Sequence, residues 1–196
     1  MAHRTGLSDE TMDELELVAR AARDARQFEP LYRRYLEPVY RYCFSRLVDK
    51  PAAEDATGRT FEKALAGLGN FRSGSFRSWL FTIAHNVVID AFRERKVMEP
   101  IVVGNPASET PGPEEAVVTA EEMRCLQGAM ARLTPEQREV VQLRMEGMTG
   151  KEIARTLGRS LGSVKMLQLR AVERLRTLLA DQALGPARPD TGARRE

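Results

Sequence analysis

The sequence is poor in the residues that build metal centres, disulfides and catalytic sites. Cysteine and histidine occur twice each, as Cys43, Cys125, His3 and His85, and the two cysteines do not form a CxxC pair. We therefore expect reduced thiols, no zinc or other metal ligands and no cofactors. His85 has no nucleophile beside it in the sequence, and no phosphate-binding glycine loop is present. These absences predict no catalytic residues and a protein that is not an enzyme.

Long apolar runs are also absent. The longest, such as residues 101–103, span only a few residues, whereas a membrane-spanning helix needs ~20. Residues 1–10 are polar and carry acids, which does not resemble a signal peptide. Charged residues make up 30% of the chain, a share that argues against a membrane protein. We expect a cytoplasmic protein with no membrane partner.

The sequence shows helical periodicity and no convincing strand pattern. From Phe76 to Arg95 the apolar residues form one stripe, and Asn86, Asp90 and Arg93 lie on the opposite side. Residues 97–113 break this pattern with four prolines. We predict an all-α fold with two helical domains, residues 11–96 and 114–183, joined by a flexible linker at 97–113. Residues 1–10 and 184–196 are predicted to be disordered.

The second domain carries the pattern of a helix-turn-helix. Thr134 with Gln137, and Thr149 with Glu152, have the spacing of capping boxes that start two helices. Gly158 then supplies a turn before another helix begins near Leu161. The positions that favour this motif over a plain three-helix bundle are Ile153, Ala154, Leu157 and Val164, which pack the two helices together.

Positive charge gathers on this motif. From residue 151 to residue 176 there are seven bases and two acids, a balance of 7 − 2 = +5, which is typical of phosphate binding. In a helix-turn-helix the second helix enters the major groove with its N-terminal half. The residues predicted to face duplex DNA there are Ser163, Lys165, Met166, Leu169 and Arg170. The residues predicted to hold phosphates are Lys151, Arg155 and Arg159.

Several motifs carry a family resemblance. The runs 133–138, 147–149, 152–154, 157–158, 162–165 and 170–171 resemble the C-terminal domain of sigma factors, and also that of LuxR-type regulators. In the first half, residues 28–32, Tyr35, Val39, 53–55, 60–61, 79–80, 83–84 and 86 resemble the other sigma domain. Both halves together are similar to the extracytoplasmic-function group of sigma factors, which keeps only these two domains.

The resemblance implies a transcription-initiation factor with core RNA polymerase and promoter DNA as partners. An anti-sigma factor is a usual further partner of the group, and the acidic linker would pass through the polymerase cleft. The implied contacts with the polymerase clamp are Glu54, Asp55, Arg59 and Glu62. The implied contacts with the minus-ten element, as duplex and as melted single strand, are Phe71, Arg72, Asn86, Asp90 and Arg93, with Phe71 and Asn86 forming the pocket for an extruded base. The basic helix-turn-helix would read the minus-thirty-five element.

The chain departs from the family pattern in two places. Ala56-Thr57-Gly58-Arg59 stands where large apolar residues and a Gln-Glu pair are usual, and Met166-Leu167-Gln168 replaces a polar-basic-apolar triplet in the recognition helix. In the second case Leu167 is expected to take over the packing. Three alternatives stay open at this point: a LuxR-like regulator that acts without core polymerase, a sigma-like antagonist and an enzyme.

Overall fold

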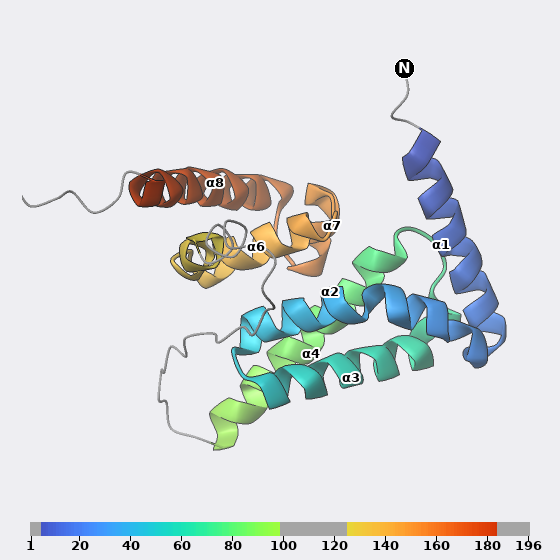
Figure 1. The fold of residues 1–196 in the computed structure, drawn as a ribbon. Coiled ribbons are helices and arrows are strands. Elements are labelled where there is room, and N and C mark those ends of the chain that lie inside the picture. Colours follow the sequence, from blue (N-terminus) through green and yellow to red (C-terminus); the bar gives the residue numbers. More distant parts are fainter. Residues whose placement is uncertain (1–4, 99–124, 184–196) are drawn as a thin grey trace, which may run out of the picture.

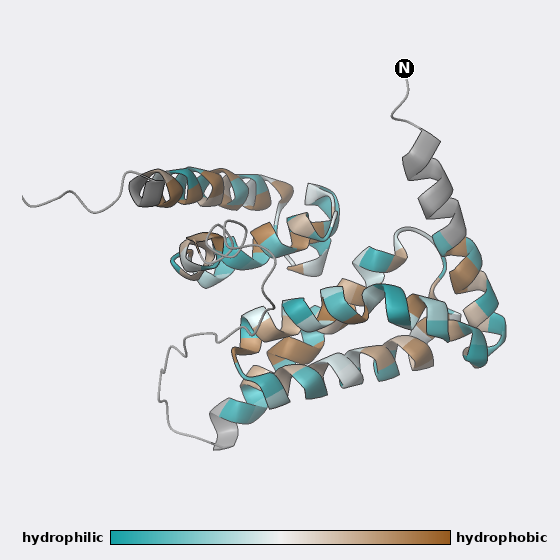
Figure 2. Cartoon of the chain, viewed as in Figure 1, coloured by the Kyte–Doolittle hydropathy of each residue, from teal (hydrophilic) through white to brown (hydrophobic). Residues whose placement is uncertain are grey.

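The computed structural model describes residues 5–98 and 125–183 (Figure 1). Within these two ranges all regular structure is helical and no strand occurs, so the predicted all-α fold class is confirmed. The helices form two groups, one from each half of the chain, and the second group lies against one side of the first (Figure 1). Hydrophobic and hydrophilic residues alternate along each helix, as expected for amphipathic helices (Figure 2).

The N-terminal group is a bundle of three long helices with a fourth packed across one end. Its elements are α1 (Thr5–Arg23), the 3-10 turn η1 (Ala25–Phe28), α2 (Glu29–Leu47), α3 (Lys50–Gly67), the 3-10 turn η2 (Leu68–Asn70) and α4 (Phe76–Met98). Helices α2, α3 and α4 pack on one another, and α1 contacts α2, α4 and η2. The bundle therefore supports α4, the helix that carries most of the predicted minus-ten residues.

The C-terminal group is smaller. It contains a helical stretch at residues 125–131, α6 (Pro135–Met145), α7 (Gly150–Thr156) and α8 (Leu161–Ala183). Helix α8 packs across both α6 and α7 and lies on the side of the group that faces away from α2 (Figure 1).

Local hydrogen bonds fix where α6 and α7 begin. Thr134 Oγ1 accepts from the Gln137 backbone N–H at 3.2 Å, and Gln137 Oε1 accepts from the Thr134 N–H at 3.1 Å. Thr149 and Glu152 make the same reciprocal pair at 3.3 and 2.7 Å. Each pair satisfies backbone donors that a helix start otherwise leaves free, and both predicted capping boxes are confirmed.

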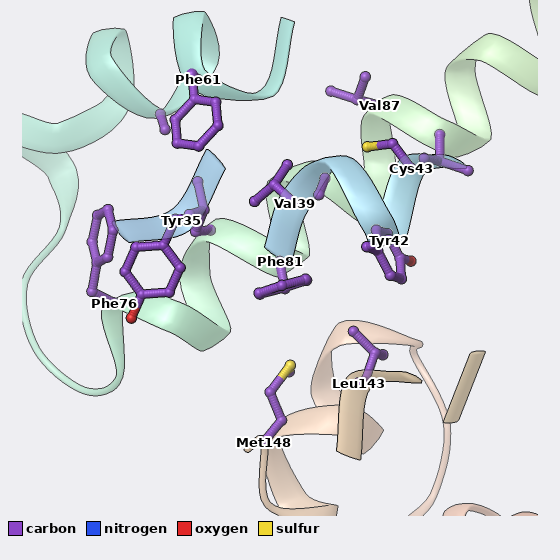
Figure 3. Close-up of a cluster of buried hydrophobic side chains, with 14 of the residues drawn as sticks. Tyr35, Val39, Tyr42, Cys43, Phe61, Phe76, Phe81, Val87, Leu143 and Met148 are labelled. Atoms are coloured by element: carbon purple, nitrogen blue, oxygen red, sulfur yellow. The ribbon is translucent and has the colours of Figure 1, made fainter. Parts of the chain in front are cut away.

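One hydrophobic core runs through both groups (Figure 3). Phe81 of α4 is fully buried, and its ring packs edge-on against Tyr42 of α2 with centroids 5.6 Å apart. Leu143 and Met148 of the C-terminal group are buried in the same cluster, on the side of Phe81 opposite Val39 (Figure 3). Cys43 is fully buried in the same cluster, near Val87 (Figure 3). The two halves therefore share core residues instead of merely being tethered.

Two boundaries differ from the sequence-based prediction. Residues 5–10, predicted to be disordered, belong to α1, because no proline interrupts the chain before Pro30 and an existing helix extends at little cost. Residues 97 and 98, predicted to start the linker, belong to α4, which ends just before the residue that precedes Pro100. Pro38 lies inside α2 without ending it. The rest of the predicted linker and the C-terminal tail lie outside the described residues.

Gly58 lies in the middle of α3 with nothing within 4 Å of the position that a Cβ would occupy. We expect Gly58→Ala to raise the free energy of unfolding by about 1 kcal/mol, because alanine loses less backbone entropy in a helix. Urea denaturation measures the change. Gly158→Ala is the matched control and should lower stability, because Gly158 has a φ of +62°. A destabilised Gly58→Ala protein would contradict the expectation.

Candidate nucleic-acid interface

The helix-turn-helix is built as its sequence predicts. Ile153 of α7 and Val164 of α8 are fully buried and hold the two helices together. Gly158, at a φ of +62°, makes the turn, and the Arg159 N–H donates to the Ala154 carbonyl at 2.9 Å. Ser160 then caps α8 by accepting from the Ser163 N–H at 3.1 Å. The motif therefore presents the first turns of α8 in a fixed orientation.

The first half of α8 has an exposed face made by four of the five residues predicted to read DNA. Lys165, Met166, Leu169 and Arg170 are exposed, whereas Ser163 is half-buried. Neither Lys165 nor Arg170 has an ion-pair partner in residues 5–98 or 125–183. Leu167 packs against the core, as expected from the departure at 166–168. Both cations are thus free to meet a phosphate or a base edge.

The residues predicted to hold phosphates divide into two classes. Lys151 and Arg155 of α7 are exposed and have no ion-pair partner among the described residues. Arg159 instead donates to Glu136 of α6. A phosphate would therefore have to compete with the Glu136 carboxylate for Arg159. At Lys151 and Arg155 a phosphate would meet no competing carboxylate among the described residues.

The minus-ten residues lie along α4 and at the turn before it. Phe71 follows η2 and is half-buried, with its ring centroid 6.0 Å from that of Phe76 and 5.6 Å from that of Trp79. Arg72 and Asn86 are exposed. Phe76 and Asn86 are ten residues apart on one helix, which corresponds to about 15 Å. Phe71 thus packs on the first turns of α4 and Asn86 lies further along the same helix, and their shared pocket stays a prediction.

Asp90 and Arg93 continue the exposed row of α4 beyond Asn86. Asp90 is half-buried and pairs with Lys63 of α3 at 3.7 Å and with Arg93 at 3.6 Å. An acid on a DNA-facing row would repel phosphate, and these two pairs reduce that repulsion. Arg93 remains exposed for most of its side chain.

The residues predicted to contact polymerase lie on α3, and one of them is engaged within the chain. Glu54, Asp55 and Glu62 are exposed. Arg59 donates two hydrogen bonds to Glu94 of α4, at 3.1 and 3.0 Å, and lies 3.6 Å from Asp55. The hydrogen bonds and charge of Arg59 hold the pKa of Glu94 below its ordinary value. Arg59 is a cation at a position where the family pattern has a Gln-Glu pair. Glu94 neutralises its positive charge within the chain.

A buried polar cluster between the two groups was not foreseen from the sequence. We define the Glu139 cluster as Glu139 of α6 with Tyr42 and Arg46 of α2 and His85 of α4. Tyr42 Oη donates to Glu139 Oε1 at 2.8 Å, and His85 Nδ1 lies 2.9 Å from the same oxygen. Because an ionised carboxylate only accepts, Nδ1 carries the hydrogen. The Arg46 Nε, 3.5 Å away, adds an ion pair.

The charge state of Glu139 follows from these neighbours. Burial by itself raises the pKa of Glu139, but the His85 hydrogen bond, the Arg46 charge and the Tyr42 hydrogen bond outweigh it and hold the pKa below its ordinary value. Burial also raises the pKa of Tyr42 well above its usual range, with Glu139 adding to the effect. His85, for which the sequence predicts no catalytic role, lies in this cluster.

In the part of the chain that the structure describes, no group of three or more His, Cys, Asp or Glu side chains is placed to hold a metal ion. Likewise, none of the described helices combines the length and the apolar character needed to cross a bilayer.

Family models and relatives agree on both halves of the chain. Sigma-70 region 2 matches residues 31–97, and Sigma-70 region 4 matches residues 123–175. The chain is 40% identical over 176 residues to the ECF RNA polymerase sigma factor BldN of Streptomyces coelicolor, which covers 86% of this chain and 67% of BldN. It is 31% identical over 180 residues to the RNA polymerase sigma factor CarQ of Myxococcus xanthus, covering 89% and 100%. The chain spans only 62% of the SigE sigma factor of Mycolicibacterium smegmatis, to which it is 32% identical over 78% of its own length.

Solved structures give the same answer for the fold. The sigma factor RpoE in its complex with the anti-sigma factor NepR from Bartonella quintana has a TM-score of 0.65 and 25% identity, covering 79% of this chain and 98% of that one. CnrH in complex with the cytosolic domain of CnrY has a TM-score of 0.60 and 26% identity, covering 84% and 96%. No comparison supports the LuxR-like alternative, because region 2 of a sigma factor accounts for the N-terminal group. The chain belongs to the extracytoplasmic-function group of RNA polymerase sigma factors, which serve in transcription initiation.

Proposed function

We propose that the chain recruits core RNA polymerase to promoters, with the N-terminal group at the minus-ten element and the C-terminal group at the minus-thirty-five element. The observation that supports this most directly is the joint presence of both sigma regions with an exposed, unpaired basic face on α8. The test is run-off transcription with core polymerase on genomic fragments. Specific transcripts are expected only when the chain is added, and their absence with every fragment would refute the proposal.

The proposed partners follow from the relatives. RpoE and CnrH are each found with a second protein, an anti-sigma factor in the first case, and we propose an anti-sigma partner for this chain as well. Catalysis is assigned to the polymerase and none to this chain. Because the polymerase works in the cytoplasm, we propose that location for the chain too.

Helix α3 is the proposed docking surface for core polymerase. Glu54, Asp55 and Glu62 are exposed carboxylates on this helix, and they can meet basic residues of a partner. Arg59 contributes through Glu94, whose position it fixes. The surface is thus more acidic than its four proposed residues suggest, since the one cation among them is already paired.

Asn86 is proposed to hold an extruded minus-ten base, since its amide can both donate and accept hydrogen bonds on an exposed face of α4. We expect Asn86→Ala to slow open-complex formation about tenfold, the equivalent of one or two hydrogen bonds. Duplex binding should change little. Permanganate footprinting reports the melted strand, and a gel shift on the closed duplex is the comparison. Equal losses in both assays would remove Asn86 from the pocket.

Arg170 is proposed to contact the minus-thirty-five duplex directly. Arg170→Ala should weaken binding by about 1–3 kcal/mol and reduce the slope of log affinity against log salt by about one. Arg176→Ala is the matched control, because it removes another exposed arginine six residues further along α8. Fluorescence anisotropy at several salt concentrations measures both quantities. An unchanged slope for Arg170→Ala would contradict the assignment.

A further inference from the structure

The outward face of the first half of α8 is apolar at its centre. Val164, Ala171 and Leu178 are buried and form the stripe with which α8 packs on the rest of the C-terminal group. Met166 and Leu169 project on the opposite side of the helix, where they are 47% and 51% exposed. Because other residues form the buried stripe, packing within the described part of the chain does not account for these two side chains.

Cations flank this apolar pair on both sides. Since successive residues are turned by about 100° around a helix, Lys165 lies on one side of the line through Met166 and Leu169, and Arg170 lies on the other. Both cations are exposed, and they can hold the phosphates or guanines on either side of a base step. The apolar pair would then face the base edges between them.

The charge pattern also indicates where this face ends. Glu173, one turn beyond Leu169 on the same outward line, is an exposed carboxylate, which a phosphate repels. At the other end, the cap at Ser160 fixes the start of α8. The part of α8 suited to DNA therefore runs from its cap to Arg170, and the apolar pair lies inside it.

An exposed apolar side chain has one chemical partner in the major groove of unmodified DNA. The C5-methyl group of thymine is the alkyl group that the base edges present there, among hydrogen-bond donors and acceptors. Met166 and Leu169 are three residues apart, which separates them by about 4.5 Å along the helix axis. Neighbouring base pairs are separated by a similar distance, roughly 3.4 Å. The pair therefore fits the methyl groups of thymines in neighbouring base pairs.

We propose that Met166 and Leu169 read thymine methyl groups in the minus-thirty-five element, so that the chain selects promoters with thymine at one or two neighbouring positions there. The proposal rests on the sigma function proposed above and adds the base that the recognition helix selects. Met166 belongs to the triplet that departs from the family pattern, at a position where a polar residue is usual. The thymine preference is therefore a property of this recognition helix and not of the family pattern.

Replacing thymine by uracil tests the proposal, because uracil keeps the hydrogen-bonding edge of thymine and lacks only the methyl group. The full chain, bound to core polymerase, first selects its preferred duplex from a pool that is random at the minus-thirty-five position. Each thymine of that duplex is then replaced singly by uracil, and a gel shift measures the affinity of the same complex. At one or two neighbouring positions uracil should weaken binding about fourfold, the contribution of one buried methyl group.

Alanine variants assign each methyl contact to a side chain. Met166→Ala and Leu169→Ala should each bind the thymine duplex at least as weakly as the wild-type chain binds a uracil duplex, and each should show no further loss with uracil at its own position. Both side chains are exposed, so the variants should fold. Val172→Ala is the matched control, because it shortens an apolar side chain that is 42% exposed on α8 beyond Arg170. This control should keep the full uracil effect.

Two readouts decide the outcome. A selected duplex in which no thymine is sensitive to uracil would overturn the proposal, and so would alanine variants that keep the full uracil effect. Variants that lose affinity for core polymerase instead of for the duplex would show that this face meets a protein, which would overturn it as well. Run-off transcription tests the sigma function separately: if transcripts still depend on the chain, only the reading of thymine is wrong. A complex that selects no duplex and starts no transcript would refute both.

Discussion

Raising the pH from 9 to 11 should cost the folded chain about 5 kcal/mol of stability, a large share of what a domain has. Burial, with Glu14 adding to it, raises the pKa of Tyr35 well above its ordinary value of 10, and burial with Glu139 does the same for Tyr42. Burial raises the pKa of Cys43 to about 11. In the unfolded chain tyrosine titrates near 10 and cysteine near 8.5.

The sign follows from which state holds the proton. All three folded pKa values are raised, so the stability they contribute is complete below about pH 8.5 and is lost as the pH rises toward the folded values. Urea midpoints at several pH values measure the loss. Tyr35→Phe should flatten the dependence, whereas Tyr32→Phe, which changes a ring that is 40% exposed, should not. A midpoint that stays constant between pH 9 and 11 would show that these groups ionise freely in the folded chain.

Phe81→Ala should lower the free energy of unfolding by about 3–5 kcal/mol, the usual cost of removing a buried ring. Phe81 is fully buried and lies between α2 and the residues Leu143 and Met148 of the C-terminal group (Figure 3). We therefore expect the loss to affect both groups and to lower the cooperativity of unfolding, since the shared core is what couples them.

The measurement uses two probes in one urea titration. Trp79 is the one tryptophan, and its fluorescence reports the N-terminal group, whereas circular dichroism reports all helices. Leu178→Ala is the control, because Leu178 is buried on α8 but lies outside the shared core. It should separate the two transitions and leave the midpoint of Trp79 near its wild-type value. A Phe81→Ala protein in which only the Trp79 transition moves would argue against a shared core.

Local signals in the sequence account for most of the helix boundaries. The capping boxes at Thr134 and Thr149 and the positive φ of Gly158 depend on residues within a few positions of one another, so a linear pattern contains all the information needed. The same is true of the buried stripe on α4, where Phe76, Leu80, Ala84 and Val87 are fully buried. The family resemblance, which combined both halves, added the functional assignment.

Contacts between distant residues were not predictable in this way. The partners in the Glu139 cluster are 54 and 97 positions apart, for His85 and Tyr42 respectively, and no pattern within one helix connects them. Arg59 with Glu94 is a similar case, at a separation of 35. Phe71 and Asn86 are assigned to one pocket because both are suited to binding a base, and this assignment stays a prediction.

Cys43 illustrates how burial controls reagent access. A thiol that is fully enclosed and protonated at neutral pH reacts slowly with alkylating agents and oxidants. Cys125, which is only half-buried, should therefore take up a maleimide dye first and provide a single attachment point without mutation. Slow modification of the second thiol then measures how often the N-terminal bundle opens completely, which makes the native chain its own reporter of global unfolding.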